Sequence, residues 1–137
     1  MIKPGIYSNI SLSIFRLDNM HFSVGCDIEK IKRFQEVLGN KRFLSRIFTA
    51  QELRRSRKTR FPEVYYARKF AGKEAVFKAL SALGYKTPMK SIEIYENGKG
   101  WDTANVLCGK IDKRYKIFIS LSNTKDVAIA SSVVMEI

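Results

Sequence analysis

The longest regular pattern in the chain is helical and runs from Pro62 to about Leu83. Within it, apolar residues recur at intervals of three and four positions between Phe70 and Leu80, as expected for the buried face of a helix. Proline is favoured in the first turn of a helix and glycine just beyond the last, so Pro62 and Gly84 mark its ends. The sequence therefore predicts one long helix around which the rest of the chain is organised.

Shorter helical patterns come before this helix, and alternating patterns typical of strands come after it. The elements predicted before it are a strand over 21–26, a helix over 27–38, a short helix or turn over 42–48 and a helix over 49–57. The strands predicted after it cover 90–95, 101–107, 115–122 and 127–135. Helices first and strands second predict an α+β fold, with the helices packed on an antiparallel sheet.

Two positions mark predicted helix starts. Asp27 follows the first strand pattern and can act as an N-cap by accepting hydrogen bonds from free backbone N–H groups. Thr49 and Glu52 have the spacing of a capping box, in which each side chain accepts a hydrogen bond from the backbone of the other. The last strand pattern, 127–135, is apolar on both faces, which is typical of a central strand or of a strand at a subunit interface.

The chain carries a net charge of +12, from 25 Lys and Arg residues against 13 Asp and Glu residues. Such a surface attracts anionic partners, which include nucleic acids, anionic lipids, nucleotide-like cofactors and acidic proteins. Eight of the basic residues lie between Lys41 and Arg60, with Glu52 as the one acid among them. A run of this kind is also typical of a solvated face, and no helix-turn-helix, zinc or RNA-recognition motif accompanies it.

The first 19 residues differ in character from the remainder and lack the basic start, long apolar core and cleavage site of a secretory signal. We expect 1–19 to be an N-terminal extension, either disordered or translated from an upstream start codon, and 20–137 to be one domain. Cys26 and Cys108 lack the spacing of a zinc site, and no stretch is apolar enough to span a membrane. These features predict reduced thiols and a cytoplasmic protein.

The polar residues of the long helix are candidates for chemistry. Glu74 and Lys78 are four positions apart and share one face, and Lys69 and Lys73 flank them. A carboxylate among ammonium groups can hold a metal ion together with a phosphorylated ligand, whereas the alternative is a solvated face with one ion pair. Magnesium commonly takes one or two carboxylates, several waters and substrate phosphates. Asp27 and Glu74 supply such a pair of carboxylates if the fold brings them together.

Four segments resemble, in order, those of the holo-acyl-carrier-protein synthases, the small single-domain class of 4′-phosphopantetheinyl transferases. The combination of G-x-D with a later F-x-x-K-E-A-x-x-K makes this resemblance specific. The segments are GCDIEKIKRF (25–34), RIFTAQEL (46–53), FAGKEAVFKAL (70–80) and SLSNTKDVAIASSVV (120–134). The resemblance implies transfer of 4′-phosphopantetheine from coenzyme A to a serine of apo-acyl carrier protein in fatty acid biosynthesis, with adenosine 3′,5′-bisphosphate as the by-product.

The resemblance also implies a role for each candidate residue. Asp27 and Glu74 would bind Mg²⁺, or Mn²⁺, as catalytic residues. Glu74 would in addition accept the serine proton, and Lys78 would stabilise the leaving bisphosphate. The residues that it implies in coenzyme A binding are Lys69, Lys73, Lys78, Lys86 and Asn123.

The family resemblance implies partners as well. An acidic acyl carrier protein would dock on the basic surface, with arginines holding its carboxylates and one phenylalanine as an apolar anchor. The docking residues implied are Arg33, Arg42, Phe43 and Arg46. Members of the family form homotrimers with active sites between subunits, so we expect the same here, with neither nucleic acid nor membrane as a partner.

The sequence departs from the family pattern in three places. Asn123 stands where histidine is usual, and an amide cannot titrate near neutral pH. Ser81 and Ala82 replace glycines of the turn that follows Lys78, and Gly98-Lys99-Gly100 stands where Gly-Lys-Pro is common. The first two departures motivate an alternative, a weak or inactive family member that binds coenzyme A or carrier protein; a basic nucleic-acid-binding module is a further alternative.

Overall fold

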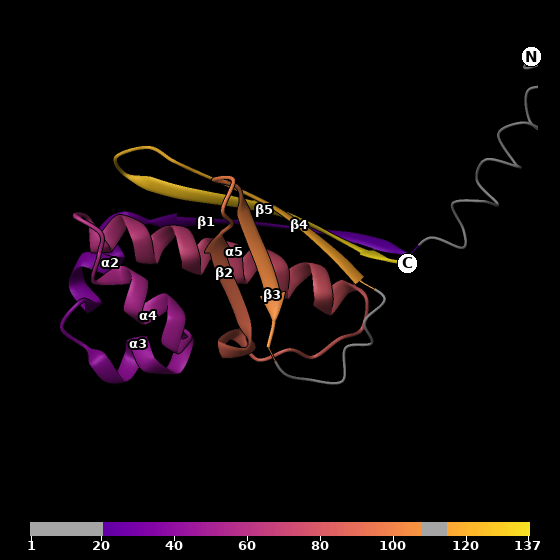
Figure 1. Cartoon of the computed structure of the whole chain (residues 1–137), viewed down its shortest axis with the longest axis horizontal. Helices are drawn as coiled ribbons and strands as arrows, with labels where there is room; N and C mark the ends of the chain where they lie inside the picture. Colours follow the sequence, from indigo (N-terminus) through magenta and orange to yellow (C-terminus); the bar gives the residue numbers. More distant parts are fainter. Residues whose placement is uncertain (1–20, 108–114) are drawn as a thin grey trace, which may run out of the picture.

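The long helix α5 (Pro62–Ala82) lies at the centre of the computed structural model, which describes residues 21–107 and 115–137 (Figure 1). Pro62 occupies its first turn, and Gly84 follows it with a φ of +88°, so both predicted ends are confirmed. None of the helices in the described ranges is long and apolar enough to cross a membrane. The predicted extension, residues 1–19, lies outside the described residues.

Three short helices precede α5 and gather at one end of the molecule (Figure 1). They bury Ile31, Phe34 and Leu44 together with the first half of α5. The capping box predicted at the third of them is confirmed, since the backbone N–H of Thr49 donates to Glu52 Oε1 over 2.9 Å and that of Glu52 donates to Thr49 Oγ1 over 3.1 Å. The three helices are α2 (Ile31–Val37), α3 (Lys41–Ile47) and α4 (Ala50–Ser56).

Two antiparallel sheets lie against α5, which confirms the predicted α+β fold. The larger sheet has the order β1-β5-β4 and consists of β1 (Phe22–Lys30), β5 (Val127–Glu136) and β4 (Tyr115–Asn123). The smaller is a hairpin of β2 (Ile92–Glu96) and β3 (Asp102–Val106), preceded by the 3₁₀ turn η1 (Met89–Ser91). β5 is the central strand of its sheet, which is one of the two positions that its apolar pattern predicted.

The predicted helix over 27–38 begins too early. β1 continues to Lys30, and Asp27 is a strand residue paired with Ala130 of β5 rather than an N-cap. All nine residues of β1 pair with β5, and the backbone N–H of Ile31 then donates to Asp126 O over 2.9 Å. A complete ladder of backbone pairs therefore outweighs the local capping preference of one aspartate.

Gly25 allows β1 to approach α5 closely. A Cβ atom at this position would lie 1.8 Å from the carbonyl oxygen of Ala75, a distance that no side chain tolerates. Side chains alternate between the two faces of a strand, so Asp27 points to the same side of β1 as this contact. Gly25 thus determines how close Asp27 lies to α5.

Gly25→Ala is expected to lower the free energy of unfolding by roughly 1–3 kcal/mol or more, because β1 must move away from the backbone of α5. Urea denaturation measures this loss. Gly39→Ala is the matched control, since a Cβ atom there meets no atom within 4 Å. Equal stability of the two variants would contradict the close-approach argument.

Candidate active site

Asp27 and the α5 residues Glu74 and Lys78 come together where β1 crosses α5. Lys78 Nζ lies 3.1 Å from Asp27 Oδ1 and donates a second hydrogen bond to the carbonyl oxygen of Cys26 over 2.9 Å. The charges of Asp27 and Lys78 both act on Glu74, which places the three side chains in one electrostatic cluster. Lys78 thus pairs with a strand residue 51 positions away, and its charge also acts on Glu74 one turn before it on α5.

The site leaves oxygen atoms free for a cation. The Asp27 side chain is only 12% exposed, and its Oδ2 atom is buried with no hydrogen-bond partner among the described residues. An unpaired buried carboxylate oxygen is unfavourable, and a bound cation would satisfy it. The described residues contain no cluster of three or more His, Cys, Asp or Glu side chains with the geometry of a metal site. A metal held by Asp27 and Glu74 would therefore take its other ligands from water or from a bound phosphate.

The charge state of the site follows from burial and from neighbouring groups. Burial raises the pKa of Glu74, and the Asp27 carboxylate raises it further, whereas Lys78 and Arg33 act in the opposite direction. The hydrogen bond with Asp27 raises the pKa of Lys78. Glu74 is therefore a stronger base than an exposed glutamate, and Lys78 keeps its proton.

Glu29 is a third carboxylate in this region that the sequence did not reveal. Its side chain is 11% exposed, and Arg33 Nη1 lies 3.2 Å from its Oε2 atom. Burial, followed by the neighbouring Asp27, raises its pKa to about 7, while Arg33 opposes this shift. Because Glu29 belongs to β1, strand alternation turns it to the same side as Asp27, two residues before it.

The raised pKa of Glu29 predicts a pH-dependent stability. The folded chain keeps this proton up to about pH 7, whereas an unfolded glutamate loses it near its ordinary pKa of 4.5. Folding stability therefore falls as the pH rises through this interval and then levels off. Glu29→Gln should reduce this fall, measured as melting temperatures in metal-free buffer, whereas the exposed Glu36→Gln should not. An unchanged profile for Glu29→Gln would contradict the prediction.

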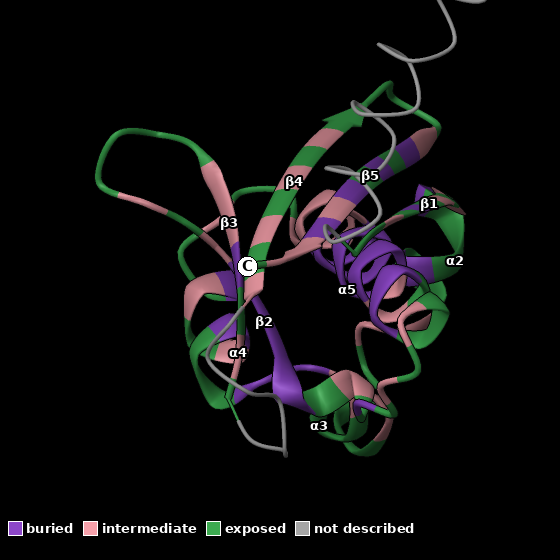
Figure 2. Ribbon diagram, turned by 90° about the vertical axis from the view of Figure 1, so that its right-hand side faces the viewer, coloured by how far each residue is buried: buried purple, intermediate pink, exposed green. Residues whose placement is uncertain are grey.

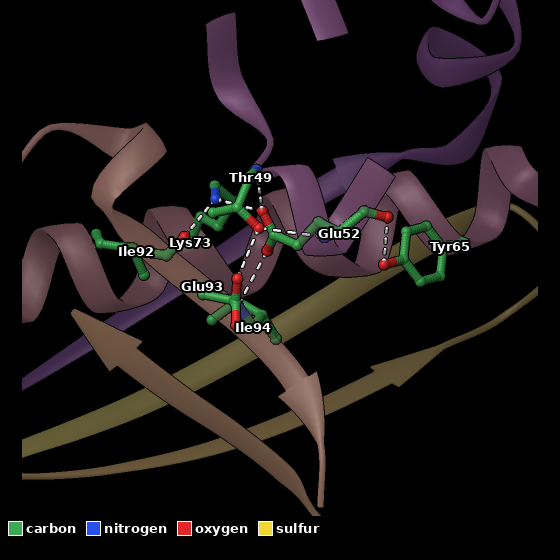
Figure 3. A network of polar contacts seen from close by, with 7 residues as sticks. All are labelled: Thr49, Glu52, Tyr65, Lys73, Ile92, Glu93 and Ile94. Carbon is green, nitrogen blue, oxygen red and sulfur yellow. Dashed lines mark hydrogen bonds and ion pairs between the residues drawn. The ribbon is translucent and has the colours of Figure 1, made fainter. Parts of the chain in front are cut away.

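Lys73 does not belong to this site, and its predicted role in coenzyme A binding is wrong. Its side chain is completely buried, with Nζ 2.6 Å from Glu52 Oε1 and in a second hydrogen bond to the carbonyl oxygen of Ile92 (Figure 3). Glu52 accepts further hydrogen bonds from the backbone N–H groups of Thr49 and Ile94. An ammonium group held in this way is not available to a phosphate at the surface. The buried pair instead joins α5 to α4 and β2.

Lys69 and Asn123 lie near a different feature, a pocket of about 400 Å³ formed by α4, α5 and the β2–β3 hairpin. Lys69 lines this pocket, and its Nζ is 4.0 Å from Asp102 Oδ1. Arg68, which also lines it, donates to Asn123 Oδ1 over 2.7 Å and lies 3.5 Å from Asp102 Oδ2. The remaining lining residues are Arg55, Thr59, Phe61, Val64, Tyr65 and Glu96. Among the residues implied in coenzyme A binding, Lys78 therefore lies beside Asp27, whereas Lys69 lines this pocket and Asn123 contacts Arg68 of its lining.

A family model described as the 4′-phosphopantetheinyl transferase superfamily matches residues 23–131, which is most of the chain. The chain belongs to this superfamily. A holo-[acyl-carrier-protein] synthase from Wolbachia pipientis (strain wPip) is 38% identical over 122 residues, covering 84% of this chain and 98% of the relative. The corresponding protein from Caldicellulosiruptor saccharolyticus is 35% identical over 120 residues, covering 83% and 96%.

Solved structures of superfamily members share the fold. The holo-ACP synthase from Plasmodium yoelii superposes with a TM-score of 0.70 at 25% identity, covering 86% of this chain and 98% of that one. A holo-(acyl-carrier-protein) synthase from Bacillus anthracis, solved in complex with coenzyme A, gives a TM-score of 0.70 at 23% identity, covering 84% and 96%. The α+β architecture described above is therefore that of the superfamily.

The other residues implied by the superfamily lie on the surface. Arg33 is on α2, with its side chain 57% exposed, and the other residues expected to dock a carrier, Arg42, Phe43 and Arg46, are on α3 at the same end of the molecule (Figure 1). Lys86 is exposed in the segment between α5 and η1. Where the family has a Gly-rich turn, this chain continues α5 through Ser81 and Ala82, and both of these residues are exposed.

Proposed function

We propose that this chain transfers the 4′-phosphopantetheine group of coenzyme A to a serine of apo-acyl carrier protein and releases adenosine 3′,5′-bisphosphate. The observation that carries this proposal is the convergence of Asp27, Glu74 and Lys78, 51 positions apart at the extremes, in a chain of this superfamily. The similarity to holo-[acyl-carrier-protein] synthases over nearly their whole length supports the same activity.

Asp27 and Glu74 would hold Mg²⁺ or Mn²⁺, and such an ion, when bound, offsets the negative charge of the coenzyme A diphosphate. Three features of these side chains support the assignment. Both are acidic, they lie close enough for their charges to interact, and Asp27 has a buried oxygen without a partner.

The protein's own side chains account for the movement of the proton. The serine oxygen attacks the phosphorus atom that carries pantetheine, and the bond from that phosphorus to the bridging oxygen breaks. Glu74 accepts the serine proton, directly or through a water molecule, and its raised pKa favours this transfer. Lys78 remains protonated and donates a hydrogen bond to the leaving bisphosphate. Asp27 orients Lys78 through the 3.1 Å contact.

We also propose that the active site is completed by neighbouring copies in a homotrimer. A helix turns about 100° per residue, so Lys69 lies roughly opposite Lys78 on α5. Lys78 faces β1, whereas Lys69 faces Asp102 of β3. A single coenzyme A molecule contacts both lysines more easily when Lys69 belongs to one copy of the chain and Lys78 to a neighbouring copy.

The outer face of the larger sheet supports this assembly. Buried and exposed residues alternate along β5 (Figure 2), and the face turned away from α5 carries exposed apolar side chains. These are Phe22, Val24, Ile28, Phe118 and Ile129. An exposed apolar surface of this extent is typical of a subunit interface. Light scattering of the purified chain should give the mass of a trimer, and a monomer at micromolar concentration would contradict the proposal.

The basic end of the molecule is the proposed docking surface for the carrier protein. Arg33, Arg42 and Arg46 are exposed there, and Phe43 is partly exposed. Arginine binds carboxylates through two parallel hydrogen bonds, which suits an acidic partner. This surface lies at the same end as Glu29, whose ion-pair partner Arg33 connects it to the carboxylate cluster.

The experiment that tests the activity follows the nucleotide product. The purified chain is incubated with coenzyme A, Mg²⁺ and apo-acyl carrier protein, and adenosine 3′,5′-bisphosphate is separated by chromatography. We expect release of this product only when all three are present. Binding of coenzyme A without release would instead support the alternative of an inactive family member.

A further inference from the structure

Arg55 is the unexplained charge in the pocket beside Lys69. It lies on α4 and lines the pocket together with Arg68 and Lys69. Its Nη1 nitrogen is buried, and none of the described residues accepts a hydrogen bond from it. A buried guanidinium N–H without an acceptor is unfavourable, because it has lost its water and gained no partner. The Nη1 group of Arg55 is therefore available to donate a hydrogen bond to an anionic ligand.

The neighbouring cations have partners that Arg55 lacks. Asp102 lies 3.5 Å from Arg68 and 4.0 Å from Lys69, and Asn123 accepts a hydrogen bond from Arg68. The guanidinium carbon of Arg55 lies 5.6 Å from the centre of the Tyr95 ring, a cation–π contact that offers Nη1 no hydrogen-bond acceptor of the usual kind. The N–H groups of a guanidinium form a planar fork that suits phosphate oxygens, and the Nη1 group of this fork is without an acceptor among the described residues.

The scaffold around Arg55 holds it in place. Glu52, three residues before it on α4, lies in the buried network with Lys73 (Figure 3). Tyr65 of α5 donates its hydroxyl hydrogen to the carbonyl oxygen of Glu52 over 2.8 Å, and Tyr65 also lines the pocket. Because these hydrogen bonds hold α4 against α5 and β2, the backbone around Arg55 loses little conformational freedom when a ligand binds.

We propose that Arg55 is a specificity-determining residue that binds the 3′-phosphate of coenzyme A. This inference rests on the proposed function. Coenzyme A carries a diphosphate and a ribose 3′-phosphate, and the proposed mechanism assigns the diphosphate to Asp27, Glu74 and Lys78. The remaining phosphate is assigned to the pocket lined by Arg55, Arg68 and Lys69. Its lining also includes Glu96 and Asp102; Asp102 pairs with Arg68 and Lys69, whereas Arg55 keeps a free buried donor. Arg55 thus distinguishes coenzyme A from dephospho-coenzyme A, which lacks this group.

Isothermal titration calorimetry of the full chain with coenzyme A and with dephospho-coenzyme A tests this assignment. The wild-type chain should prefer coenzyme A, and Arg55→Met should lose a factor of roughly 10–100 in affinity for coenzyme A, as is typical of a hydrogen bond to a charged group. Its affinity for dephospho-coenzyme A should stay within about twofold of the wild type. Methionine keeps an unbranched stem for packing against Tyr95, and a thermal melt checks that the variant folds.

Two further variants complete the test. Arg54→Met removes an exposed arginine from the same helix and should leave both affinities unchanged. Arg55→Lys keeps the charge without the planar fork and should fall between the wild type and Arg55→Met. A preference for coenzyme A that survives in Arg55→Met, or an equal loss for both ligands, would overturn the Arg55 assignment alone. A wild-type chain that binds neither ligand would overturn the proposed function together with it.

Discussion

Asp27→Asn and Glu74→Gln are each expected to reduce kcat/KM for transfer by roughly 10²–10³-fold or more, the usual effect of removing one group that stabilises charge in a transition state. Both substitutions keep the size and much of the hydrogen bonding of the side chain but remove its negative charge. Asp27→Asn removes the charge with which the buried oxygen of Asp27 would bind the metal. Glu74→Gln removes the carboxylate that would accept the serine proton, which its raised pKa favours. Initial rates of carrier modification measure the loss.

The same variants should fold normally. The ion pair of Asp27 is made with Lys78, which is half exposed, and such pairs contribute about 1 kcal/mol or less. Asp126→Asn, in the turn between β4 and β5, and Glu63→Gln, in the first turn of α5, are matched controls that should retain activity. Wild-type rates in Asp27→Asn or Glu74→Gln would rule out their assignment as metal ligands.

Lys73→Met is expected to lower the free energy of unfolding by about 3–5 kcal/mol, the usual result of breaking a buried ion pair by removing one partner. The Glu52 carboxylate would remain buried, with its charge no longer balanced by the ammonium group 2.6 Å away. The carbonyl oxygen of Ile92 would lose its hydrogen bond as well. Urea denaturation monitored by circular dichroism measures the loss.

Two comparisons make this second prediction specific. The double variant Glu52→Gln/Lys73→Met removes both charges and should recover much of the loss, because no unpaired ion stays buried. Lys78→Met removes a half-exposed lysine from the same helix and should cost less than about 1 kcal/mol. A similar stability of Lys73→Met and Lys78→Met would show that the buried pair contributes little.

Local signals in the sequence predicted much of the fold. The proline and glycine at the two ends of α5 and the capping box at Thr49 depend on neighbouring residues, so they can be read directly. The helix predicted over 27–38 is confirmed only from Ile31 onward, since Asp27 to Lys30 belong to β1. The pairing of β1 with β5 joins residues about a hundred positions apart, and no local pattern reveals it.

The residues of the candidate site were likewise predicted only in part from the sequence. The resemblance named Asp27, Glu74 and Lys78, and the fold brings these three together. Charge patterning suggested that Lys73 faces a ligand, but the structure buries it against Glu52, which the sequence identified only as part of a capping box. Which charged residue is buried depends on a partner from another element, and spacing along the chain does not specify that partner.

The intact mass of apo-acyl carrier protein, measured after incubation with this chain and coenzyme A, is the most direct test of the account. With Mg²⁺ present, we predict that the carrier gains the mass of one phosphopantetheine group on a serine. With EDTA, or with Asp27→Asn in place of the wild type, we predict that its mass stays unchanged. A carrier that stays unmodified by the wild-type chain in Mg²⁺, or that is modified equally in EDTA, would contradict the account.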